Sequence, residues 1–201
     1  MLKKFREWLT RTDEKREAAV RLMQRVELST HLYEAPDGTL FDVSLADTTS
    51  VKDILTIQKL CYDGKTPWNH SALTHEIRYN RNAFYVMVHQ NHEPAAFIGS
   101  WLVGVEAHIT NIAVVPKFQQ MGIASFLIEE LKRTAIEESI EKYSLEVRVS
   151  NYKARNLYEK LGFKKGRIKK EYYAHDHEDA LEMTMDLEAS VNENDFNVPT
   201  I

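Results

Sequence analysis

The stretch from residue 108 to residue 138 restricts the possible folds of this chain more than any other. It opens with an apolar, strand-like run, HITNIAVV (108–115), which ends at Pro116. A short loop then leads into an amphipathic helix expected at 123–138, and this loop contains no Ser, Thr, Asp or Asn to cap the helix. A helix whose first amides lack a side-chain partner either follows a plain structural turn or holds an anion.

The rest of the chain alternates between strand-like and helix-like periodicity, which predicts an α+β fold. A mixed, mostly antiparallel sheet with helices on both faces is expected. Residues 1–35 are expected to form an N-terminal helical extension, residues 36–188 one domain, and residues 189–201 a flexible tail. Further strands are predicted at 40–46, 83–90, 95–104, 143–149, 163–173 and 179–187, and further helices at 49–63, 69–80 and 152–162.

The composition limits which cellular compartment and which classes of partner are expected. None of the 201 residues lies in an apolar run of the roughly 20 residues needed to span a bilayer, so no membrane partner is expected. The basic N-terminus is not followed by the apolar segment of a signal peptide. The single cysteine, Cys61, has no partner for an internal disulfide. These features indicate a cytoplasmic protein, and the net charge of −4 argues against direct nucleic-acid binding.

Two stretches, NIAVVPKFQQMGIASFLIEEL (111–131) and LEVRVSNYKARNLYEKLGFKK (145–165), resemble the GNAT family of acetyl-CoA-dependent N-acetyltransferases. The resemblance spans residues 40–187, and Gln119, Gly122 and Ala124 match the family's Gln/Arg-x-x-Gly-x-Gly/Ala element. It implies the GNAT fold, acetyl-CoA as donor, and backbone amides of this loop that hold the pyrophosphate. Within the family, the bacterial ribosomal-protein-alanine N-acetyltransferases are most similar. This implies a peptide or protein N-terminus as partner, with the α-amine of alanine on a ribosomal protein as acceptor.

The resemblance also assigns roles to individual residues. Glu146 matches the family's general base, although an ion pair with Arg148 on the same strand face is the structural alternative. Tyr158 matches the general acid and is expected at the rim of its helix, beside an apolar face supplied by its neighbours. The alternative is an aromatic ring packed under the sheet. The residues expected to contact coenzyme A are Ile112, Ala113, Val114, Gln120, Met121, Gly122, Ile123, Ala124, Ser125 and Asn151, the last also as a helix cap.

Several positions stay open between two interpretations. Gln120 stands where many relatives carry Arg, so one positive charge for coenzyme A is missing. Trp68 either lines the acceptor pocket or fills the core. His108 is an alternative base, but a surface or hydrogen-bonded histidine is favoured. His175 and His177 lie in an acidic loop, where a polar loop is favoured over a metal site, and no metal is required.

Two other functions are compatible with the same sequence. One is an enzyme of this fold that acetylates small amines, lysines or an antibiotic. The other is a non-catalytic acyl-CoA-binding module whose N-terminal helix engages a partner. The presence of both Glu146 and Tyr158 argues against this non-catalytic module. The N-terminal segment is expected to dock on the main domain or on a neighbouring subunit, so a homodimer stays open.

Overall fold

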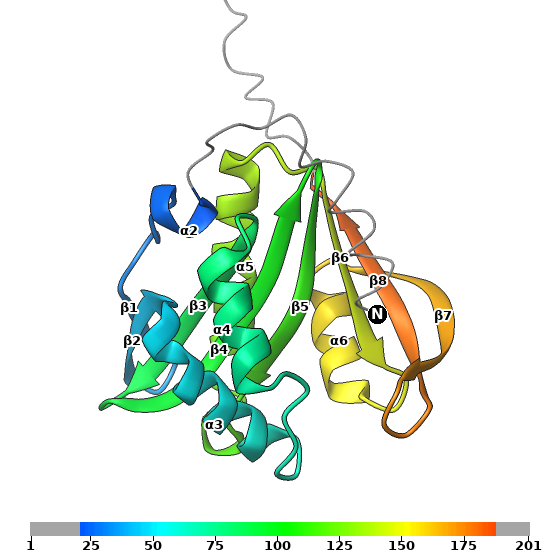
Figure 1. Cartoon of the computed structure of the whole chain (residues 1–201), viewed down its shortest axis with the longest axis horizontal. Helices are drawn as coiled ribbons and strands as arrows, with labels where there is room; N and C mark the ends of the chain where they lie inside the picture. The colour runs from blue at the N-terminus through cyan, green and yellow to red at the C-terminus, as the bar shows by residue number, and fades with distance from the viewer. Residues whose placement is uncertain (1–20, 188–201) are drawn as a thin grey trace, which may run out of the picture.

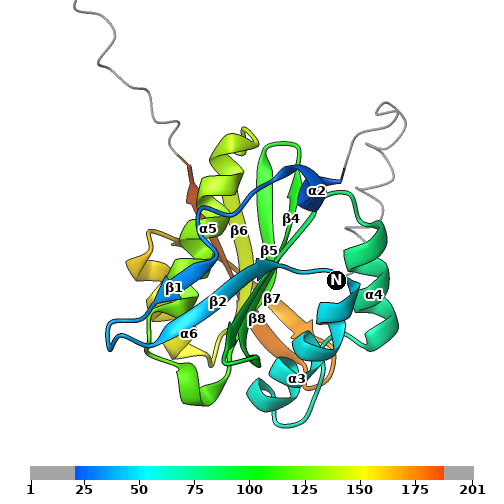
Figure 2. The same ribbon diagram turned by 90° about the vertical axis from the view of Figure 1, so that its left-hand side faces the viewer.

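The computed structural model describes residues 21–187, which form a single sheet with helices on both faces (Figures 1 and 2). Helix α3 and helix α4 cover one face, while α5 and α6 cover the other. No helix in this part of the chain is long and apolar enough to cross a membrane. The strands are β1 (Leu32–Glu34), β2 (Leu40–Leu45), β3 (Ala83–Gln90), β4 (Glu93–Val103), β5 (Glu106–Val114), β6 (Lys142–Arg148), β7 (Lys164–Tyr173) and β8 (Glu178–Asp186). The helices are α2 (Leu22–Arg25), α3 (Val51–Cys61), α4 (His70–Tyr79), α5 (Ile123–Glu137) and α6 (Tyr152–Lys160), with 3₁₀ turns η2 (Thr48–Ser50) and η3 (Pro116–Phe118).

The strand order is β1-β2-β3-β4-β5-β6-β8-β7, and every neighbouring pair is antiparallel except β5 and β6. This parallel pair is short: its register runs from Glu106 opposite Lys142 to Ile109 opposite Leu145. Beyond those rungs β5 continues to Val114 and β6 to Arg148 without pairing to each other. The sheet therefore opens between the two strands at their carboxyl ends.

A β-bulge lies where the opening begins. Gly99 of β4 pairs with Asn111, but Ser100 pairs with Ile109, so Thr110 is an extra residue on β5. The Thr110 hydroxyl donates to the Gly99 carbonyl at 3.0 Å, which anchors the bulge. Because a bulge bends its strand and increases the local twist, this one turns β5 away from β6.

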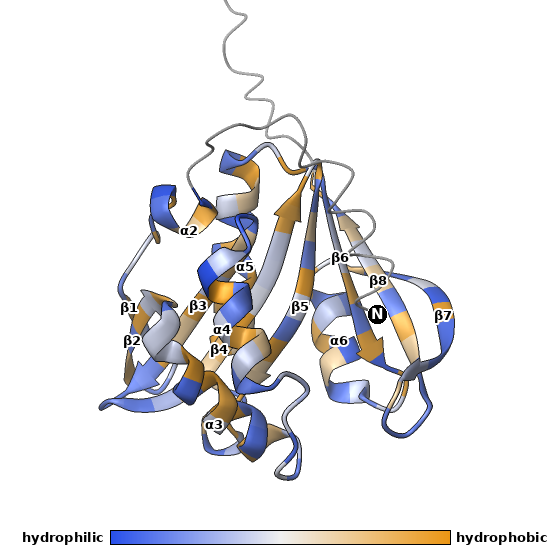
Figure 3. Ribbon diagram, viewed as in Figure 1, coloured by the Kyte–Doolittle hydropathy of each residue, from blue (hydrophilic) through white to orange (hydrophobic). Residues whose placement is uncertain are grey.

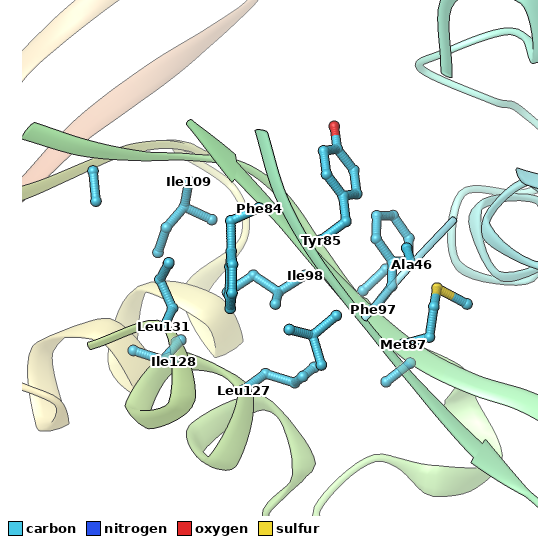
Figure 4. Close-up of a cluster of buried hydrophobic side chains, with 14 of the residues drawn as sticks. Ala46, Phe84, Tyr85, Met87, Phe97, Ile98, Ile109, Leu127, Ile128 and Leu131 are labelled. Atoms are coloured by element: carbon cyan, nitrogen blue, oxygen red, sulfur yellow. The ribbon is translucent and has the colours of Figure 1, made fainter. Parts of the chain in front are cut away.

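The core on the α5 face is built from one stripe of the helix and three central strands (Figure 4). Leu127, Ile128 and Leu131 of α5 point toward the sheet and are almost fully buried. Each such side chain contributes about 1.5–3 kcal/mol on burial. Figure 3 shows hydrophobic segments concentrated in the central strands and on one side of the helices, whereas the edge strand β7 is largely hydrophilic. The core thus fixes α5, and with it the loop that precedes α5, against β4 and β5.

The strands and helices predicted after residue 40 are confirmed, with ends that differ by at most about two residues. The described part of the N-terminal segment, residues 21–35, differs from its prediction. Within it only Leu22–Arg25 is helical, and Leu32–Glu34 joins the sheet as an edge strand rather than lying in a helical extension. Leu22 and Leu28 are core residues. Strand pairing with β2 and burial outweigh local helix propensity here. The helix expected from residue 2 lies mostly outside the described residues, as does the tail.

Candidate active site

The loop before α5 presents backbone amides rather than side chains. Gln120 and Gly122 have positive φ angles of 65° and 81°. Gly122 is the N-cap of α5 and makes no side-chain cap hydrogen bond, and the first turn of the helix has no acidic residue. The amides at this helix end carry partial positive charge and have no intrahelical partner. The absence of a capping side chain, expected from the sequence, is confirmed, and the loop fits an anionic group such as a pyrophosphate.

Two side chains hold the end of β5 where it passes into this loop. The Val114 carbonyl accepts hydrogen bonds from Cys61 Sγ at 3.3 Å and from Gln119 Nε2 at 3.1 Å. Burial raises the pKa of the Cys61 thiol to about 11, so it is a neutral thiol near pH 7 rather than a nucleophile. Residues 112–114 pair with β4 on one side only. Their other edge faces the opening and can pair with an extended ligand.

Glu146 lies at the opening on β6 and is held by three side chains. Its side chain is 9% exposed and accepts hydrogen bonds from Lys169 Nζ at 2.5 Å and from the Tyr172 hydroxyl at 2.6 Å. His108 Nε2 lies 3.3 Å away. Burial alone would raise the pKa of Glu146, but the hydrogen bond and charge of His108, together with the other two hydrogen bonds, lower it to about 2. Glu146 is therefore a firmly ionised carboxylate.

The alternative of an ion pair between Glu146 and Arg148 is wrong. Arg148 instead pairs with Asp176 at 2.8 Å and with Glu178 at 2.6 Å, and its guanidinium lies 4.0 Å from the centre of the Tyr173 ring. These contacts tie the loop between β7 and β8 to the end of β6. Within residues 21–187, no group of three or more His, Cys, Asp or Glu side chains is placed to hold a metal ion.

His108 belongs to a chain of hydrogen bonds that the sequence did not reveal. Its Nδ1 lies 2.7 Å from the Ser144 hydroxyl, which donates to the Glu106 carboxylate. An ionised carboxylate only accepts, so the Ser144 proton goes to Glu106 and the Ser144 oxygen accepts the Nδ1–H of His108. Nε2 is then the ring nitrogen that faces Glu146. An ionised carboxylate only accepts, so protonated His108 can donate its Nε2–H to Glu146, whereas neutral His108 presents a lone pair at Nε2.

Tyr158 occupies a different environment from the one predicted. It is the one buried residue of α6, and its ring centre lies 5.6 Å from that of Phe163. The prediction that Tyr158 lies at the rim is wrong, because the residue is only 6% exposed. Burial, and secondarily the nearby Tyr173 phenol, raise the pKa of Tyr158 above its ordinary value. The phenol therefore stays protonated and is a donor at neutral pH.

Two further predicted residues have clear local roles. The Asn151 side chain accepts a hydrogen bond from the Ala154 amide at 3.1 Å, so its predicted role as helix cap is confirmed. Its side-chain NH₂ is not used by the cap.

Trp68 is half-buried, with its ring edge-on to Trp101 at 6.2 Å, and Trp101 in turn lies 6.3 Å from His108. Trp68 thus belongs to an aromatic row that ends beside the Glu146 cluster.

The predicted site residues gather around one opening. The loop residues and residues 112–114 lie on the β5 side, whereas Glu146 and Asn151 lie at or just beyond the end of β6. Tyr158 comes from α6, which covers the opposite face from α3 and α4 (Figure 2). The polar partners of Glu146, namely His108, Lys169 and Tyr172, were not predicted as a cluster, because their meeting depends on strand register.

A sheet opened between two parallel strands, next to an uncapped helix and a buried polar cluster around a carboxylate, is the arrangement of an acyl-CoA-dependent N-acyltransferase. The chain belongs to the acetyltransferase (GNAT) family, whose family model matches residues 51–163. It is therefore an enzyme that transfers an acetyl group from acetyl-CoA to an amine.

Individual relatives agree with this assignment. A [ribosomal protein bS18]-alanine N-acetyltransferase of Escherichia coli K12 is 31% identical over 147 residues, which is 72% of this chain and 97% of the relative. The crystal structure of the ribosomal-protein-S18-alanine N-acetyltransferase from Escherichia coli matches with a TM-score of 0.66 and 29% identity, over 77% of this chain and 97% of that one. The PaiA N-acetyltransferase of Thermoplasma acidophilum, solved with coenzyme A, shares the fold at a TM-score of 0.61 and 14% identity, over 73% and 99% of the two chains.

Proposed function

We propose that this enzyme acetylates the N-terminal α-amine of a protein in the cytoplasm, and that its acceptor is the N-terminal alanine of a ribosomal protein. The names of its relatives from Escherichia coli support this acceptor. Lysines, small amines and antibiotics are the competing acceptors. A homodimer and the absence of nucleic-acid binding remain predictions.

The observation that carries the catalytic proposal is the contact between Glu146 and His108. The charge and hydrogen bond of His108 are the largest causes that lower the pKa of Glu146, so the low value belongs to the pair with a proton on His108. The charge of the Glu146 carboxylate in turn stabilises that proton on Nε2. Neutral His108 can therefore accept the proton of the α-ammonium at Nε2, with Glu146 stabilising the positive charge that results. Glu146 thus acts as part of a proton-accepting pair.

The donor side relies on backbone and on two side chains. Acetyl-CoA, when bound, supplies an acetyl thioester. Residues 120–125 offer amides to its pyrophosphate, residues 112–114 offer a strand edge to its pantetheine arm, and Asn151 offers its free side-chain NH₂. Tyr158, which burial keeps protonated, donates a proton to the departing sulfur.

The acceptor approaches from the α3 and α4 face. Trp68 forms a wall there through its contact with Trp101, which leads to His108. An α-amine at the end of a chain can reach the Glu146–His108 pair while the rest of the acceptor stays outside.

Intact mass spectrometry tests the acceptor class. The enzyme and acetyl-CoA are mixed with a peptide that starts with alanine followed by basic residues including lysine, and separately with the same peptide blocked at its N-terminus. We expect one added acetyl group on the free peptide and none on the blocked one. Acetylation of the blocked peptide would overturn the α-amine proposal in favour of lysine. Absence of acetylation on both, with acetyl-CoA binding verified in the same samples, would overturn this class of acceptor.

A further inference from the structure

The segment between α2 and β1 runs along the acetyl-CoA helix α5 (Figure 2). Arg25 forms an ion pair with Glu138, directly after the carboxyl end of α5. In the middle of the helix, Glu130 is buried and accepts hydrogen bonds from the Ser29 amide at 2.7 Å and from the Ser29 hydroxyl. At the amino end, Tyr33 contacts the loop that precedes α5. Residues 25–33 therefore form a strap that holds α5 along its whole length.

Tyr33 fixes the loop at the point where the pyrophosphate is proposed to bind. Its hydroxyl donates a hydrogen bond to the Met121 carbonyl at 2.8 Å, and its ring stacks on Phe126 of α5 at 4.6 Å between centres. The hydroxyl lies so close to Gly122 that a Cβ at this position would collide with it. Burial raises the pKa of Tyr33, which keeps the phenol a donor.

Because the peptide unit is planar, the hydrogen bond from Tyr33 to the Met121 carbonyl also sets the direction of the Gly122 N–H. The Met121 carbonyl and the Gly122 N–H belong to one planar peptide unit, and in a trans peptide they point in opposite directions. A hydroxyl that holds the carbonyl on the β1 side therefore turns the N–H of Gly122 away from β1. This N–H is the first of the uncapped amides at the start of α5.

We propose that Tyr33 is a positioning residue for acetyl-CoA, which orients the amides of the pyrophosphate loop from outside the site. The proposal rests on the proposed pyrophosphate contacts of residues 120–125. Tyr33 lies before the residues 51–163 that the family model matches. A segment outside the matched region thus sets the affinity for the donor, through one hydrogen bond.

The test compares Tyr33→Phe with the wild-type enzyme by calorimetric titration with acetyl-CoA in the absence of any acceptor. Phenylalanine keeps the stack on Phe126 and removes only the hydroxyl. We expect the Kd for acetyl-CoA to rise about fivefold, the effect of losing one ordinary hydrogen bond. The Kd for S-acetylpantetheine, which lacks the pyrophosphate, is expected to stay unchanged in a ligand-observed NMR titration. Tyr79→Phe, an exposed tyrosine on α4, is the matched control and is expected to change neither value.

The binding constants of the Tyr33→Phe variant either support or overturn the proposed role of Tyr33. A selective loss of acetyl-CoA affinity, with the thermal unfolding midpoint of Tyr33→Phe close to that of the wild type, supports the proposal. An unchanged Kd for acetyl-CoA overturns it. Equal losses for acetyl-CoA and S-acetylpantetheine also overturn it, because they indicate general loosening of the site. Because no acceptor is present, these results are independent of whether the enzyme acetylates alanine.

Discussion

Replacing Glu146 by glutamine isolates the electrostatic contribution of the carboxylate. The folded protein lowers its pKa from 4.5 to about 2, and a shift of roughly 2.5 units corresponds to about 3 kcal/mol of stability. Because the folded pKa is the lower one, this contribution is complete above pH 4.5 and is lost as the pH falls toward 2. Linkage leaves about 1.4 kcal/mol of it at pH 3. With a side chain only 9% exposed, solvent screening is weak.

Urea unfolding at pH 7, 4 and 3 measures this contribution. We expect Glu146→Gln to be less stable than the wild type by about 3 kcal/mol at pH 7 and by about half that at pH 3. Glu182→Gln is the matched control, because Glu182 also contacts Lys169, at 2.9 Å, but its carboxylate is more exposed. Its loss is expected to stay under about 1 kcal/mol.

A stability difference for Glu146→Gln that is equal at pH 7 and pH 3 would refute the reasoning. It would mean that the substitution acts through packing and not through the ionised carboxylate. The same variant is expected to lower kcat/KM by about 10²–10⁴-fold, because the charge that stabilises protonated His108 is gone.

Three more substitutions test other parts of the site. Gly122→Ala is expected to weaken acetyl-CoA binding in calorimetry more than tenfold, whereas Gly38→Ala, at a similar φ of 85° with open space around it, carries only the backbone penalty of about 1–2 kcal/mol and leaves binding intact. Ser144→Ala removes the hydroxyl that orients His108, so kcat is expected to fall about tenfold with the Kd for acetyl-CoA unchanged, and equal rates would contradict the assigned tautomer. Tyr158→Phe is expected to lower kcat about 10²-fold in steady-state assays while acetyl-CoA still binds, and an undiminished kcat would remove it as the acid.

The sequence was sufficient for the elements that local patterns specify. The apolar run before Pro116, the uncapped helix that starts after Gly122 and the cap at Asn151 depend on residues a few positions apart, and all three are confirmed. The burial of Tyr158 was not predicted. Helical periodicity indicated that the neighbouring leucines form the buried face of the helix and that Tyr158 lies beside it. The side chain that a helix buries most deeply also depends on the surface it meets.

The polar cluster could not be predicted, because it depends on register between distant strands. His108 meets Ser144 across the parallel pair, and Glu146 meets Lys169 from a strand that is not its neighbour in the sheet. The bulge at Thr110 shifts the alternation of side chains along β5, so a period of two read through that strand assigns faces wrongly. No local signal in the sequence marks either effect.

The short parallel seam between β5 and β6 also has a consequence for how the sheet opens. Strands β1 to β5 form one run of antiparallel neighbours, while β6, β7 and β8 form a second group, and the four rungs of residues 106–109 with 142–145 are the strand contacts that join them in the described part of the chain. The seam has fewer rungs than the β3–β4 and β4–β5 pairs, so we expect it to open before those pairs do. The donor is proposed to bind across this junction. Acetyl-CoA is therefore expected to slow global unfolding and to protect the seam amides from hydrogen exchange more than those of β3 and β4.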